Sequence, residues 1–202
     1  MAAVSETIVR EYFELHGFLV RQDRKFEARG KQEVDGIDFF VWNPQPVQPA
    51  SPAPFILDST SLPSVNRALV VVRGWHTESF GPALLESSPE IFRFVEPAVF
   101  QQAARAFSPG LAPLKILIVP ALPQTAAARD HSIAILRAKG VDAVIPFRTM
   151  LLDLIAHTEV NRNYDKSDLL QVIRVLKNYQ LFKDPQMDLF RGHRRSKPPR
   201  RP

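Results

Sequence analysis

Five consecutive apolar residues, Ala68 to Val72, constrain the fold of this 202-residue chain more than any other feature. Three of them are valines, whose branched side chains favour extended structure. An apolar run without polar alternation is typical of a strand that is buried on both faces and lies at the centre of a sheet. A second run, 114–119, is interrupted only by Lys115. We therefore expect a sheet that is covered by helices on both sides.

Apolar residues at helical spacing predict the helices, and prolines and glycines mark where they begin and end. Pro89 and Pro97 each stand where a helix begins, and the second of these helices is expected to run to about Phe107. Gly17 and Gly140 are placed to end helices. The other expected helices are 5–16 with Ser5 as its N-cap, 125–139, 148–157 and 167–179.

Three strands are expected in succession after the first helix, which fits a meander or hairpins. The later strands are separated by helices, so they need right-handed crossovers and parallel pairing. The sequence therefore predicts an α/β fold with a mixed sheet. The expected strands are 18–20, 37–42, 68–72, 114–119 and 141–147.

Two segments differ in composition from the rest of the chain. Residues 43–66 hold six prolines and no glycine. Because proline donates no backbone hydrogen bond, we expect a long extended surface loop there. Residues 184–202 are polar, basic and proline-rich, which predicts a disordered tail. The remaining residues, 1–183, are expected to form a single domain.

The formal net charge of +5 comes from the end of the chain. Residues 191–202 hold six of the 26 basic residues and none of the 21 acidic ones, so residues 1–190 carry a net charge of −1. A cluster of one sign is predicted to add salt-sensitive affinity for polyanions. The basic tail therefore accounts for the high isoelectric point of the chain. That value supports a nucleic-acid-binding domain only weakly.

Missing residue types exclude several functions. The absence of cysteine excludes disulfides, cysteine-ligated zinc and a cysteine nucleophile. No glycine-rich phosphate loop, no Gly-x-Ser-x-Gly motif and no His-x-x-x-His pair is present. No apolar run approaches the ~18 residues of a membrane span, and residues 1–6 lack a signal-peptide pattern. We expect a soluble, cytoplasmic protein that makes no membrane contact.

Three charged side chains lie where elements begin or end. Glu6 is in the first turn of the first predicted helix, where the helix dipole alone also favours an acidic residue. Asp38 is the second residue of the predicted strand 37–42. Arg73 follows the valine-rich strand, and His76 comes shortly after it. Carboxylates beside a cation are the groups that metal-assisted phosphate hydrolysis uses.

This arrangement resembles the PD-(D/E)XK nuclease superfamily, whose restriction-endonuclease-like core has the order αβββαβ. The resemblance covers about residues 5–120, and further strand–helix units would extend the core on its C-terminal side. Glu6 resembles the acidic residue of the superfamily's first helix, and Asp38 resembles its metal-binding aspartate. The resemblance implies a Mg²⁺-dependent phosphodiesterase that acts on nucleic acid, with Glu6, Asp38 and Arg73 as its catalytic residues.

The superfamily's Glu-x-Lys motif would fall on Val71-Val72-Arg73. Valine then replaces an acidic ligand, and arginine replaces a lysine. Arginine holds phosphate, but it stays protonated and cannot act as a base. Glu78 or Glu33 could supply the missing carboxylate, and we take Glu78 as the candidate metal ligand beside Asp38. The site is therefore expected to be degenerate.

Basic residues beside the expected cleft are candidates for contacts with DNA phosphates. We expect a nuclease-like, nucleic-acid-binding protein, and a homodimer is compatible with that expectation. Two alternatives stay open, namely a non-catalytic interaction or structural protein that retains the nuclease fold, and an unrelated α/β enzyme. The candidate nucleic-acid-binding residues are Arg21, Arg24, Lys25, Arg29, Lys31 and His76.

Overall fold

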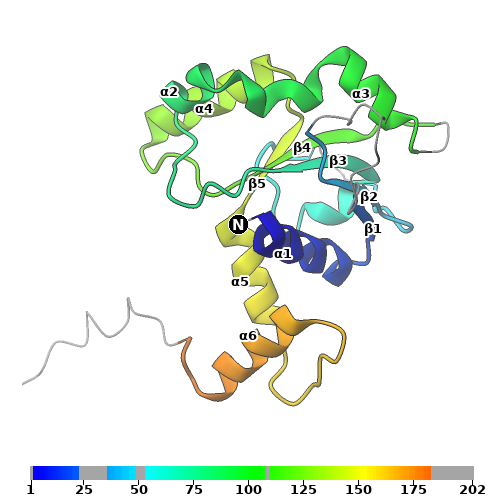
Figure 1. The fold of residues 1–202 in the computed structure, drawn as a ribbon, viewed down its shortest axis with the longest axis vertical. Coiled ribbons are helices and arrows are strands. Elements are labelled where there is room, and N and C mark those ends of the chain that lie inside the picture. The colour runs from blue at the N-terminus through cyan, green and yellow to red at the C-terminus, as the bar shows by residue number, and fades with distance from the viewer. Residues whose placement is uncertain (1, 23–35, 49–52, 108–109, 183–202) are drawn as a thin grey trace, which may run out of the picture. The chain divides into compact units, whose positions relative to one another are not determined.

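The computed structural model describes residues 2–22, 36–48, 53–107 and 110–182 (Figure 1). The chain divides after His157 into two compact units, residues 1–157 and residues 158–202. Each unit is described by itself below. The single domain expected over 1–183 stays a prediction, and the tail expected at 184–202 lies outside the described residues.

A five-stranded mixed sheet forms the centre of the first unit, with its strands in chain order from β1 to β5. β2 is antiparallel to both of its neighbours, whereas β3, β4 and β5 are parallel to one another. This arrangement confirms the predicted α/β class and the mixed pairing. The strands are β1 (Leu19–Gln22), β2 (Phe39–Trp42), β3 (Arg67–Val72), β4 (Leu114–Val119) and β5 (Ala143–Pro146).

The valine-rich run lies at the centre of the sheet, as the sequence predicts. β3 pairs with β2 on one side and with β4 on the other. Its residues Ala68 to Val71 have no exposed surface. Burial on both faces explains why the run needs no polar alternation.

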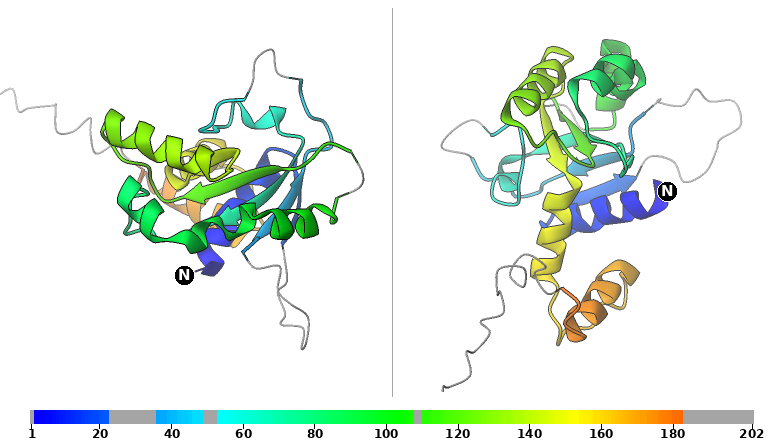
Figure 2. Two further views of the ribbon diagram at one scale, coloured as in Figure 1. Left: turned by 90° about the horizontal axis from the view of Figure 1, so that it is seen from above. Right: turned by 90° about the vertical axis from the view of Figure 1, so that its left-hand side faces the viewer.

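Helices cover both faces of the sheet, as Figures 1 and 2 show. One face carries α1 and α5, which contact each other. The other face packs against α2, α3, α4 and a 3₁₀ helix, η2. A second 3₁₀ helix, η1, is Leu62–Ser64. The remaining bounds are α1 (Ala2–Leu15), α2 (Pro82–Ser87), η2 (Pro89–Val95), α3 (Pro97–Ala104), α4 (Ala126–Ala138) and α5 (Phe147–His157).

α1 begins earlier than the sequence predicts. It starts at Ala2, so Ser5 lies inside the helix and the prediction that Ser5 is its N-cap is wrong. Glu6 consequently lies beyond the first turn. Gly17 ends the helix as expected, since its φ of +78° is unfavourable for other residues. His16 Nε2 lies 2.6 Å from Asp153 Oδ2, which joins the end of α1 to α5.

The other elements differ from the prediction mainly in type and in where they begin and end. Pro89 begins a 3₁₀ helix instead of an α-helix, and the short helix α2 before it has no counterpart in the prediction. α3 ends at Ala104, short of the expected end near Phe107. β2 begins at Phe39, so Asp38 directly precedes the strand.

No helix in the described part of the chain is both long enough and apolar enough to cross a membrane.

The expectation of an extended surface loop at 43–66 is wrong for the second half of that segment. Phe55, Leu57 and Leu62 are buried in the core. Ile56 forms a parallel bridge with Val144 of β5. The prolines exclude a regular strand, but the apolar residues between them still pack.

The second unit contains α6 (Asp168–Asn178) and the segment before it. Ser167 is the N-cap, because its Oγ accepts a hydrogen bond from the Leu170 backbone N–H at 3.2 Å. Arg174 Nε donates to the Val160 carbonyl, and Lys177 Nζ donates to the Thr158 carbonyl. These bonds hold the preceding segment against the helix, whose start the sequence predicts.

Candidate functional site

A charged hollow of about 480 Å³ lies where α1 and β2 begin and where β3 ends. We call it the strand-end pocket. All three predicted catalytic residues, Glu6, Asp38 and Arg73, line it. Its lining residues are Ser5, Glu6, Gly36, Asp38, Val72, Arg73, Gly74, Trp75, Glu90 and Arg93.

Asp38 is positioned by the pairing of β2 with β3. Phe39 is the partner of Val70, so continuing that register by one residue places Asp38 opposite Val71. The Asp38 backbone N–H donates to the Val70 carbonyl at 3.0 Å. Its Oδ2 accepts a hydrogen bond from the Val72 N–H at 2.6 Å. The carboxylate therefore extends the hydrogen-bonded ladder, and one of its oxygens is already engaged by the protein.

Arg73 comes from the end of β3 and is largely enclosed, with a side chain only 16% exposed. Its Nη1 lies 4.0 Å from Asp38 Oδ2. Burial lowers the pKa of the Arg73 guanidinium, and the negative charges of Asp38 and Glu90 oppose that shift. Arginine nevertheless remains protonated at neutral pH. The guanidinium thus sits among carboxylates that compensate its charge.

α1 is fixed to the segment after β3 by two close contacts. Ser5 Oγ is 3.0 Å from His76 Nε2, a hydrogen bond between residues far apart in the chain. A Cβ added at Gly74 would come within 2.5 Å of Ser5 Oγ, so only glycine fits beside the helix. Glu6, the next residue, accepts a hydrogen bond from Gln22 Nε2 at 2.5 Å. Glu6 is held by this bond while it lines the pocket.

Two charged residues of the pocket, Glu90 and Arg93, are missing from the sequence prediction. Both come from η2, and side chains three residues apart in a 3₁₀ helix point the same way. That spacing was visible in the sequence, but nothing in it placed η2 near Asp38. When these two residues are included, the pocket is lined by the carboxylates of Glu6, Asp38 and Glu90 and by the guanidinium groups of Arg73 and Arg93. Negative charges outnumber positive ones by one.

The Mg²⁺ site that the resemblance implies stays a prediction, and its expected ligands are not gathered in this pocket. Val71, at the position of the superfamily's acidic ligand, has no exposed surface and offers no oxygen. Within the described part of the chain, no group of three histidine, aspartate or glutamate side chains is arranged to hold a metal ion. Glu78 is absent from the lining of this pocket. It lies instead with His76, Phe147 and Arg148 in a separate hollow of about 370 Å³.

The candidate nucleic-acid-binding residues are only partly within the described chain. Arg21 is exposed on β1, where its guanidinium lies 5.5 Å from the centre of the Phe40 ring. His76 is exposed beside Phe147, with ring centres 4.6 Å apart. The other four residues, Arg24, Lys25, Arg29 and Lys31, lie outside the described residues, as does Glu33.

The fold and pocket together define an α/β protein with a mixed sheet and a charged pocket at the ends of its central strands. Comparison with known families, with curated proteins and with solved structures gives no match. The interpretation of the site therefore depends on its own chemistry.

Proposed function

We propose that this chain is a nucleic-acid-binding protein that retains the architecture of a PD-(D/E)XK nuclease and has a degenerate active site. The observation that carries the proposal is that Glu6, Asp38 and Arg73 line one pocket. They come from the first half of α1, the residue before β2 and the residue after β3, which are the elements that the resemblance names. With its 3₁₀ helices set aside, the order α1-β1-β2-β3-α2-α3-β4 supports the same αβββαβ core with one added short helix, α2, and α4, β5 and α5 extend it.

Val71 supports the degenerate interpretation most directly. A carboxylate at this position would lie beside Asp38, because the two residues are opposite each other in the register of β2 and β3. Valine removes that oxygen ligand, and Asp38 alone should hold a divalent cation only weakly. Without a cation, a pocket with an excess of carboxylates repels a phosphodiester. We therefore assign nucleic-acid affinity to basic side chains outside the pocket, beginning with Arg21.

The alternative is a non-catalytic interaction or structural protein that retains the nuclease fold. The enclosure of Arg73 favours it, since a guanidinium that faces Asp38 serves equally well as a structural ion pair. The two functions differ in one measurable property. A nucleic-acid-binding domain has an affinity for DNA that falls as the salt concentration rises and that persists when residues 191–202 are removed, whereas the alternative predicts no affinity beyond that of this basic tail.

The test measures binding and cleavage together. Fluorescence anisotropy with labelled single-stranded and duplex DNA, at several salt concentrations and with EDTA or Mg²⁺, should show salt-dependent binding. Gels of the same samples should show intact DNA, with Mn²⁺ as well as Mg²⁺. Absence of binding to both DNA forms, or binding that is lost when residues 191–202 are removed, would favour the interaction protein instead.

Asp38→Ala decides whether cleavage, if it occurs, comes from this pocket. Asp142→Ala is the matched control, because Asp142 Oδ2 accepts the Lys115 backbone N–H at 2.8 Å outside the pocket. Robust metal-dependent cleavage that Asp38→Ala abolishes and Asp142→Ala preserves would refute the degenerate site. Glu6 and Glu90 would then be the first candidates for the missing ligand.

A further inference from the structure

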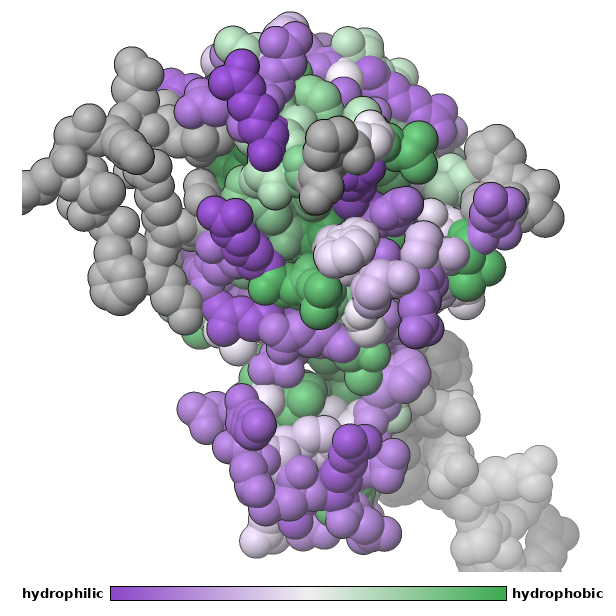
Figure 3. Space-filling view, turned by 90° about the vertical axis from the view of Figure 1, so that its right-hand side faces the viewer, coloured by the Kyte–Doolittle hydropathy of each residue, from purple (hydrophilic) through white to green (hydrophobic). Residues whose placement is uncertain are grey.

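A second hollow, of about 420 Å³, lies at the other end of β2, and no predicted function accounts for it. We call it the tryptophan groove. Its volume is within the range of ligand sites in proteins. Figure 3 views this side of the molecule and shows apolar side chains gathered among polar ones. Its lining residues are Leu19, Val20, Arg21, Phe40, Trp42, Asn66, Arg67, Ala106 and Phe107.

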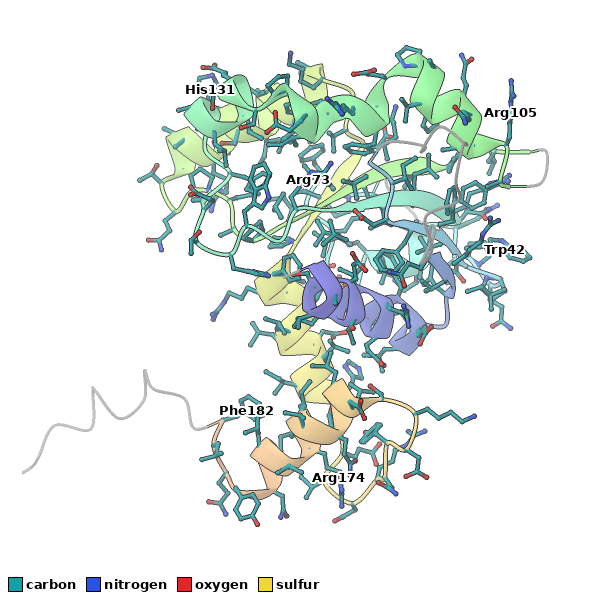
Figure 4. The ribbon with its side chains drawn as sticks, in the orientation of Figure 1. Trp42, Arg73, Arg105, His131, Arg174 and Phe182 are labelled. Atoms are coloured by element: carbon teal, nitrogen blue, oxygen red, sulfur yellow. The ribbon has the colours of Figure 1, made fainter. Side chains whose placement is uncertain are left out.

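The pairing of the strands builds the floor of the groove. Trp42 of β2 is opposite Leu19 of β1 and opposite Arg67 of β3. Side chains of paired residues lie next to each other on the same face of a sheet. Although Trp42 has a paired residue on each side, its side chain is 50% exposed. Trp42 is the last residue of β2, and Figure 4 shows it well apart from Arg73. A large indole surface therefore faces solvent.

The charges that the described residues bring to the groove have one sign. Among those residues, Arg21 and Arg67 are the only ionisable ones in its lining, and both are cationic. Each guanidinium lies over an aromatic ring, Arg21 at 5.5 Å from the centre of Phe40 and Arg67 at 5.9 Å from the centre of Phe107. A partner that complements this surface has planar apolar faces and negative charges.

We infer that the tryptophan groove binds unpaired nucleotides of single-stranded nucleic acid, an inference that rests on the proposed nucleic-acid-binding function. A base stacks on Trp42, as bases do on exposed aromatic side chains of single-strand-binding proteins. Arg21 and Arg67 contact the neighbouring phosphates. Duplex DNA keeps its bases stacked on one another, so it gains only the phosphate contacts. The groove thus distinguishes single strands from duplexes.

The test compares the full-length wild type with Trp42→Ala in anisotropy titrations with labelled oligothymidylate and with a labelled duplex. Trp42→Ala should weaken single-strand binding roughly 5- to 150-fold, the equivalent of stacking one base. Duplex affinity should change by less than about twofold, because phosphate contacts remain. Trp42→Phe should keep most of the single-strand affinity. Tyr179→Ala removes another exposed aromatic side chain, 71% exposed, and should change neither affinity.

Tryptophan fluorescence gives a second measurement on a folded chain. The chain has two tryptophans, so Trp75→Phe leaves Trp42 as the single indole. Oligothymidylate should quench its emission, and the duplex should not. Quenching by neither DNA, with single-strand affinity unchanged in Trp42→Ala, would overturn the inference while leaving the proposed function intact.

Failure of the proposed function looks different, since the wild type would then bind neither DNA form beyond the affinity of the basic tail 191–202. The groove inference would fail with it. Sedimentation would in that case test a second copy of the chain as the occupant. A wild-type dimer that Trp42→Ala converts to a monomer would assign the groove to self-association.

Discussion

The strand-end pocket and the tryptophan groove lie at opposite ends of β2, about 13 Å apart along the strand, and they use arginine in opposite ways. In the pocket, Arg73 is enclosed and faces the Asp38 carboxylate. In the groove, Arg21 and Arg67 lie over aromatic rings, and none of the described residues that line it is acidic. Charges that compensate one another stabilise the fold, whereas charges of one sign attract a ligand. Substitutions in the pocket should therefore change stability, and substitutions in the groove should change binding.

The largest effect is expected from Val71→Glu combined with Arg73→Lys, which restores the residue types of the superfamily. The new carboxylate would be buried opposite Asp38, so the free energy of unfolding should fall by about 3 kcal/mol or more. Because a divalent cation would relieve the repulsion, Mn²⁺ should restore part of the loss. Urea unfolding with and without Mn²⁺ measures both effects.

Arg73→Lys alone is the control for that double variant, since it keeps the charge and adds no carboxylate. A double variant as stable as the wild type in EDTA would contradict the placement of position 71 as a buried residue opposite Asp38.

Asp38→Ala should lower the free energy of unfolding by about 2 kcal/mol, because it removes an ion pair and leaves the Val72 N–H without its acceptor. Asp142→Ala, at a more exposed strand-end carboxylate, should cost about 1 kcal/mol. Asp38→Asn keeps an acceptor oxygen and should fall between Asp38→Ala and the wild type. Equal losses of unfolding free energy in Asp38→Ala and Asp142→Ala would mean that the ion pair with Arg73 adds nothing to the stabilisation by Asp38. Chemical denaturation of the three variants gives the order.

Gly74→Ala should lower the free energy of unfolding by about 1–2 kcal/mol. The new Cβ would force Ser5 and α1 away from the end of β3. Gly81→Ala is the matched control, since its Cβ would meet Pro123 at an ordinary distance of 3.8 Å. Thermal unfolding should separate the two variants. Similar melting temperatures would show that α1 can move without cost.

The smallest effect on stability is expected in the groove. Arg21→Ala should change the free energy of unfolding by less than about 0.5 kcal/mol, as is usual for an exposed residue. The slope of log affinity for single-stranded DNA against log salt should fall by about 0.7. Arg137→Ala is the control, because Arg137 lies 4.8 Å from the centre of the Phe55 ring, in a similar stack outside the groove. An unchanged slope in Arg21→Ala would remove Arg21 from the nucleic-acid surface.

The strands were predictable because burial itself determines their sequences. β4 matches its predicted bounds, and β3 lies at the centre of the sheet as its valines indicate. The N-cap assigned to Ser5 failed for a physical reason. Its hydroxyl pairs with His76, 71 residues away, and a local pattern cannot show such a partner.

The site was predictable only in part, for the same reason. Glu6, Asp38 and Arg73 were found because each lies at a fixed place in an ordered series of elements. Glu90 and Arg93 belong to a 3₁₀ helix whose position depends on core packing by its apolar residues, including Ile91. The groove could not be predicted from the sequence, because Trp42 and Arg67 become neighbours only through the register of β2 and β3.

The bridge between Ile56 and Val144 has a consequence for association between molecules. The Val144 N–H donates to the Phe55 carbonyl at 2.8 Å, and the Val144 carbonyl accepts the Leu57 N–H at 2.9 Å. An edge strand with unsatisfied backbone groups can recruit a strand from another molecule and begin aggregation. Here the chain's own segment occupies those groups, and Pro54, with no N–H of its own, cannot extend the pairing outward. The proline-rich segment thus leaves β5 with fewer free backbone groups for pairing with a strand of another molecule.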